Sequence, residues 1–147
     1  MKFLSNLLIC LVLISAKLHS ADLLTLCEKS NYKETPRYLE TIEYCKLLEK
    51  QSDFLKLSSF GISPQGRELP ILIYDKNMNF TPDAVRKSNN AVLFIQACIH
   101  PGESEGKDAG LMLLRDIIAN NMYAEYLDNV TIVFIPIFNV DGHERFS

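Results

Sequence analysis

The sequence predicts an α/β fold with a mixed, largely parallel sheet and flanking helices. Residues 91–98 (AVLFIQAC) and 130–138 (VTIVFIPIF) are continuously apolar and contain β-branched residues, which is typical of strands covered on both faces. Between them, residues 105–119 (EGKDAGLMLLRDIIA) place leucines and isoleucines on adjacent helical rows. Strand, helix and strand in this order indicate a right-handed crossover that joins two parallel strands.

Three further elements precede this unit. A helix is predicted to start with Thr35 as N-cap and Pro36 at its first position, and to run to about Lys50. Residues 59–75 (SFGISPQGRELPILIYD) indicate a strand end, a turn and a second strand, and the proline at position 70 places that second strand near an edge or at its own start. Residues 81–90 (TPDAVRKSNN) predict at most one or two helical turns.

Length and composition are those of one globular domain. The chain has 147 residues, of which 48% are hydrophobic and 22% charged, enough to bury a core. Its formal net charge of −3 gives no basic surface of the kind that binds nucleic acid, so no nucleic-acid partner is expected.

The N-terminus has the pattern of a secretory signal peptide. Lys2 is followed by a short apolar core (FLSNLLICLVLI) and then by the small residues Ala16, Ser20 and Ala21. A membrane anchor is the alternative, but the apolar run is shorter than the ~20 residues that a spanning helix needs. We therefore predict a signal peptide over residues 1–20, cleavage between Ala16 and Ala21, a secreted or periplasmic location, and no stable membrane anchor after cleavage.

A histidine and a carboxylate follow the first apolar strand directly. His100 and Glu103 are separated by Pro101 and Gly102, which make a sharp bend, and we expect Gly102 to let other groups approach the backbone closely. Ligands of open α/β sheets bind beyond the carboxyl ends of strands, and a nitrogen and an oxygen donor suit zinc. The alternative is structural: Glu103 would serve the start of the following helix and His100 would be an ordinary loop residue.

Three segments together resemble the zinc metallocarboxypeptidase family, which includes carboxypeptidase A. The segment QACIHPGESEGKDAGLMLLRD is similar to the family's zinc-binding H-x-x-E segment, which follows a buried strand and opens a helix. SFGISPQGRELPIL is similar to the family's G-x-S-x-x-G-R-x-L approach, and PIFNVDGHERFS to its N-P-D-G turn, with Val140 in place of the proline. The resemblance runs from about Thr25 to Ser147.

The resemblance implies a carboxypeptidase that acts on peptides or proteins with a free C-terminus. His100 and Glu103 match the family's first two ligands to one zinc ion. The third ligand, the general base and the residues that hold the substrate's terminal carboxylate lie further downstream in the family. The resemblance therefore implies that residues 21–147 are the N-terminal portion of the catalytic domain, without a catalytic residue of their own and inactive alone.

Other polar residues are expected to have structural roles. His143 should not bind zinc and should lie at the surface or support a ligand, and Glu144 should be a solvated charge. Asn139 and Asp141 should shape the N-x-D-G turn, and Arg67 should form an ion pair within the fold.

The region after the signal peptide keeps Cys27, Cys45 and Cys98, an odd number whose disulfide pairing the sequence leaves open. Cys98 ends an apolar run and is expected to be a buried, inert thiol.

Two other functions remain open at this point. One is a related zinc amidohydrolase that deacylates small amino-acid conjugates, and the other is a non-catalytic remnant or interaction module. We also expect residues 130–138 to lack a covering helix and a strand at one edge, so that the chain alone would not be a stable domain.

Overall fold

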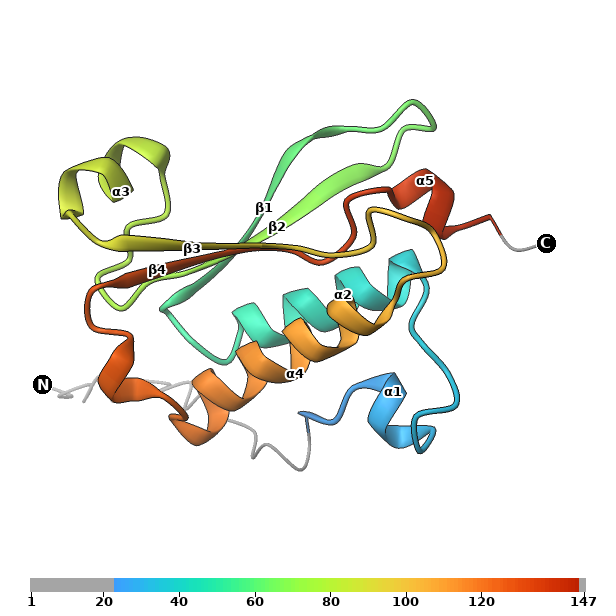
Figure 1. Cartoon of the computed structure of the whole chain (residues 1–147), viewed down its shortest axis with the longest axis horizontal. Helices are drawn as coiled ribbons and strands as arrows, with labels where there is room; N and C mark the ends of the chain where they lie inside the picture. The colour runs from blue at the N-terminus through green and yellow to red at the C-terminus, as the bar shows by residue number, and fades with distance from the viewer. Residues whose placement is uncertain (1–22, 146–147) are drawn as a thin grey trace, which may run out of the picture.

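The computed structural model describes residues 23–145 and contains one four-stranded mixed sheet with helices packed against it (Figure 1). The strand order is β1-β2-β4-β3, and the predicted α/β class is confirmed. The elements in chain order are α1 (Leu26–Lys29), α2 (Tyr38–Glu49), β1 (Leu55–Ile62), β2 (Glu68–Tyr74), α3 (Pro82–Ser88), β3 (Ala91–Gln96), α4 (Glu105–Asn120), the 3-10 turn η2 (Ala124–Tyr126), β4 (Val130–Ile135) and α5 (Val140–His143). The signal peptide predicted for residues 1–20 lies outside the described residues.

The parallel part of the sheet is the predicted crossover unit. β3 and β4 pair in parallel from Ala91 opposite Val130 to Gln96 opposite Ile135, and α4 connects them. The two pairings made by β2 are antiparallel, with β1 on one side and β4 on the other. The pairing of β1 with β2 has a local reason, because a short hairpin joins these two strands and can only be antiparallel. Parallel pairing is therefore the smaller share of the described sheet.

A tight turn joins β1 to β2, and β2 carries the proline at position 70. Ser63 N donates to Arg67 O at 2.8 Å, and Gly66 takes a φ of +80°, which a glycine adopts without strain. β2 lies inside the sheet rather than at its edge, so the alternative that placed Pro70 near the start of its strand is the correct one. β4 pairs only with residues 72–74 of β2, so the missing N–H of Pro70 costs no hydrogen bond to β4.

Helix α2 begins two residues later than predicted. Thr35 does not cap it, because its hydroxyl donates to Asp108 Oδ2 in α4 at 2.8 Å. The helix start is held instead by Glu40, whose carboxylate accepts a hydrogen bond from Arg37 N at 2.8 Å. α3 follows the prediction, with the Thr81 hydroxyl accepting from Ala84 N at 3.2 Å.

The core lies between the sheet and the two long helices. α2 and α4 lie on the same face of the sheet in Figure 1, and their buried leucines pack against Leu72 and Phe134, both fully buried. Gly110 brings α4 close to β4: a Cβ atom built at this position would lie 2.3 Å from the Phe134 ring. Helix and strand meet here at a distance that only glycine permits.

The exposed apolar strand is β3 and not β4. The expectation that residues 130–138 lack a partner at one edge is wrong, because β4 pairs with β2 on one side and β3 on the other, and most of it is buried. β3 is one of the two edge strands of the described sheet, and its Val92, Leu93 and Phe94 are 52%, 47% and 55% exposed. The expectation of cover on both faces fails for β3, because α2 and α4 lie on a single face (Figure 1).

Candidate metal centre

His100 and Glu103 meet in the turn between β3 and α4. His100 Nδ1 lies 2.9 Å from Glu103 Oε2, and the two side chains are 72% and 65% exposed. The turn stands beyond the carboxyl end of β3, the position where open α/β sheets bind ligands. The structure therefore brings the two predicted ligands together on an accessible edge of the sheet.

The backbone of this turn is held in an unusual conformation at Cys98. Its φ is +49°, in the left-handed region that favours glycine, and its Sγ donates to Glu103 O at 3.2 Å. Glu103 N donates to His100 O at 3.2 Å and closes the bend. The expected role of Gly102 is not observed, because a Cβ at this position would meet nothing within 4 Å and its φ is not positive. The left-handed backbone of Cys98, rather than a special role of Gly102, sets the direction in which the chain leaves β3.

The turn is anchored to the segment that leads from β4 to α5. Ala97 N donates to Ile135 O at 2.9 Å, and Ala97 O accepts from Phe138 N at 3.0 Å. Cys98 O then accepts from Asn139 N at 3.0 Å. Backbone hydrogen bonds thus continue past the ends of β3 and β4. The position of His100 therefore depends on where the segment before α5 lies.

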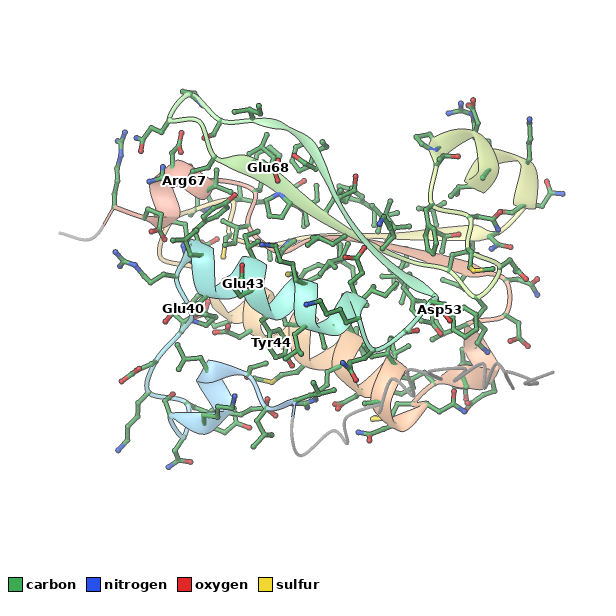
Figure 2. The ribbon with its side chains drawn as sticks, turned by 180° about the vertical axis from the view of Figure 1, so that it is seen from behind. Glu40, Glu43, Tyr44, Asp53, Arg67 and Glu68 are labelled. Carbon is green, nitrogen blue, oxygen red and sulfur yellow. The ribbon has the colours of Figure 1, made fainter. Side chains whose placement is uncertain are left out.

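Asn139 shapes the N-x-D-G turn, as predicted, whereas Asp141 bonds residues of the β1–β2 hairpin. Asn139 Oδ1 accepts from Gly142 N at 2.9 Å and shapes the first turn of α5. Asp141 accepts from the Ser63 hydroxyl at 2.8 Å and from Gln65 N at 3.1 Å. Arg67, labelled in Figure 2 on the ribbon beside α5, completes these contacts with an ion pair to Asp141 at 2.7 Å. The predicted ion pair of Arg67 is confirmed.

His143 and Glu144 are not where the sequence placed them. His143 is buried, with 4% of its surface exposed, and contacts Lys107 and Glu144 rather than solvent. Glu144 is half-buried and accepts from Tyr38 N at 2.9 Å, so it is not a solvated charge. Both corrections have one cause, the docking of α5 against the starts of α2 and α4.

Cys98 is the buried thiol that was predicted. Burial raises its pKa to about 11, so the side chain is a protonated thiol at neutral pH. Cys27, Cys45 and Cys98 are all free in the structure.

The donors present suit the first two positions of a zinc site. Two atoms bound to one tetrahedral zinc ion at ~2.0–2.2 Å lie roughly 3.4 Å apart, slightly more than the 2.9 Å between His100 Nδ1 and Glu103 Oε2. Both side chains are exposed, so a small outward rotation opens that space. Within residues 23–145 no group of three or more His, Cys, Asp and Glu residues could hold a metal ion, so a third protein ligand is not among them.

Sequence reasoning missed Lys107, which is fully buried beside His143. A signal was present: Lys107 precedes Leu111 by four residues, on the helical row that faces the core. A lysine on an apolar row predicts a buried charge with a specific partner, although the partner itself is distant in sequence.

The family model for zinc carboxypeptidases matches residues 41–147. The chain therefore belongs to the zinc carboxypeptidase family, and the resemblance found in its motifs is confirmed. No helix among residues 23–145 has the length and apolar character needed to cross a membrane.

Solved metallocarboxypeptidases share the fold. The carboxypeptidase A of Helicoverpa armigera is 18% identical with a TM-score of 0.62, over 83% of this chain and 31% of that one. Bovine thrombin-activatable fibrinolysis inhibitor, solved with a tick carboxypeptidase inhibitor, is 18% identical with a TM-score of 0.60, over 78% and 34%. The metallo-carboxypeptidase of Burkholderia cenocepacia is 20% identical with a TM-score of 0.57, over 71% and 27%. The chain thus spans 27–34% of the length of these three structures.

Proposed function

We propose that this chain is the N-terminal portion of the catalytic domain of a secreted zinc carboxypeptidase, which releases C-terminal residues from peptides. The observation that carries the proposal is the contact of His100 Nδ1 with Glu103 Oε2 in the turn after β3. Membership of the zinc carboxypeptidase family supports the reading of this pair as zinc ligands rather than as a helix-start carboxylate and a loop histidine.

The residues of this chain supply two donors for the metal site and hold them in position. When bound, zinc supplies a Lewis acid that polarises the scissile carbonyl and lowers the pKa of a bound water. His100 and Glu103 supply a nitrogen and a carboxylate donor. Without metal, His100 Nδ1–H donates to Glu103 Oε2 and keeps both side chains on the same side of the turn; this proton would give way to zinc. The strained backbone of Cys98 and the hydrogen bond from Asn139 N fix the direction in which His100 leaves the sheet.

The proposal assigns the remaining chemistry to chain outside residues 1–147. The structure spans about a third of the solved metallocarboxypeptidases that it matches, and no third metal ligand lies within residues 23–145. A general base and a group that binds the substrate's terminal carboxylate would come from the same missing part. The 147-residue chain is therefore proposed to be inactive alone.

The test is hydrolysis by the product of the complete reading frame. We expect release of C-terminal amino acids from peptides with a free carboxylate, no release from the same peptides with a C-terminal amide, and loss of activity with a zinc chelator. The secreted product should begin between Lys17 and Asp22. Deacylation of N-acyl amino acids without peptide hydrolysis would favour the amidohydrolase, and neither activity would favour a non-catalytic remnant.

A further inference from the structure

Lys107 connects three segments from a fully buried position. It lies in the first turns of α4, and its Nζ donates to Pro36 O in the segment before α2. The same Nζ lies 3.1 Å from His143 Nε2 in α5. A lysine is rarely buried without a specific reason, because its charge costs free energy away from water.

The chemistry of lysine fixes the tautomer of His143. An ammonium group only donates hydrogen bonds, so His143 Nε2 must present a lone pair to it. The ring proton then lies on Nδ1, which faces Glu144 Oε1 at 3.3 Å, an oxygen that also accepts from Tyr38 N at 2.9 Å. The result is a continuous set of hydrogen bonds from Pro36 through Lys107, His143 and Glu144 to Tyr38.

The His143 ring cannot take up a second proton without disrupting these hydrogen bonds. On a protonated His143, Nε2–H would point at the Lys107 ammonium, two donors and two positive charges in a buried space. Burial first and the Lys107 charge second lower the pKa of His143, and Glu144 opposes them without reversing the net effect. The other charged or titratable groups around Lys107 and His143 are Cys27, Arg37, Cys98, Asp108 and Glu144.

The position of α5 matters for the metal turn. Asn139, which precedes α5, donates from its backbone N to Cys98 O, two residues before His100. We propose that Lys107, His143 and Glu144 form an acid-sensitive clasp, which closes α5 on α4 while His143 is neutral and opens when His143 is protonated. The clasp itself involves no metal ligand, so it holds whether or not the chain binds zinc.

The experiment is a pH titration of the histidine side chains by 15N-correlated NMR on the secreted product of the complete reading frame. His143 is assigned by its loss in His143→Gln. At pH 7 we expect a neutral ring with the proton on Nδ1, and a titration midpoint below that of the same histidine in the urea-unfolded chain. Protonation should shift the backbone amides of Tyr38 and of residues 140–145 together with the ring.

Two variants test the role of Lys107 itself. Lys107→Met should raise the His143 midpoint and weaken the Nδ1–H preference, whereas the control Lys76→Met, whose lysine pairs with Asp128, should change neither. A proton on Nε2 in the wild type at pH 7, or a midpoint at or above the unfolded value, would overturn the proposal. If Lys107→Met does not fold, Glu144→Gln serves in its place: an unchanged His143 midpoint in that variant would equally contradict the clasp.

Discussion

At the scale of single residues, the sequence predicted the metal pair and missed what holds it. His100 and Glu103 could be found because three residues across a turn suffice to bring their side chains together. The left-handed backbone of Cys98 and the partner of the buried Lys107 could not be found, since both depend on contacts with the α5 segment about 40 residues away. Short-range chemistry is readable from sequence, whereas long-range partners are not.

The clasp predicts that stability depends on pH in a defined window. The pKa of His143 is lowered in the folded chain, so the unfolded chain binds more protons below the ordinary value of ~6.5. The free energy of unfolding should be largest above that pH and fall as the pH drops from about 6.5 towards the lowered pKa. Urea unfolding at pH 7, 6 and 5 measures this change, and Lys107→Met should flatten it. A wild-type free energy of unfolding that is constant between pH 7 and 5 would contradict the clasp.

At the scale of elements, the strand–helix–strand unit was predicted with nearly correct bounds, because its apolar periodicity is strong. The start of α2 was wrong, since the Thr35 hydroxyl that would cap it bonds Asp108 in α4. The exposure of β3 was also unpredictable, because a continuously apolar strand looks the same whether or not its faces are covered.

Because α4 packs closely on β4, adding one methyl group at Gly110 should lower the free energy of unfolding. Gly110→Ala would place a Cβ 2.3 Å from the Phe134 ring, so the ring or the helix must move. We expect a loss of about 1–3 kcal/mol in the free energy of unfolding, the usual cost of overpacking a core. Gly106→Ala is the matched control on the same helix, because its Cβ would lie 3.3 Å from Ala97 Cβ and should cost less. Equal stability of the two variants in urea unfolding would show that the packing is looser than described.

At the scale of the whole molecule, the described chain leaves one apolar strand of its sheet, β3, partly uncovered. α2 and α4 cover one face of the sheet, and β3 leaves Val92, Leu93 and Phe94 about half exposed at its edge. An exposed apolar edge strand is a site for pairing with other chains. Under the proposed function, further parts of the catalytic domain would cover this strand.

The exposed strand β3 predicts self-association of residues 21–147, the chain without its predicted signal peptide. We expect light scattering at micromolar concentrations to give a mass above that of the monomer, and Phe94→Lys to reduce it, because the charge would interrupt the apolar surface of β3. Leu39→Lys is the control, since Leu39 is also an exposed apolar side chain, 72% exposed, but lies on α2. A monomeric wild type, or equal effects of the two substitutions, would show that β3 is not the associating surface.

The central claim is that His100 and Glu103 are zinc ligands, and a zinc titration followed by the NMR signals of the His100 and His143 imidazoles tests it most directly. Zinc should shift the His100 ring and leave the His143 ring unchanged, with weak binding because only two protein ligands are present. Glu103→Gln should abolish the response, whereas Glu105→Gln, which changes another exposed carboxylate two residues away, should preserve it. A zinc response at His143 in place of His100, or equal loss in the two glutamate variants, would contradict the account.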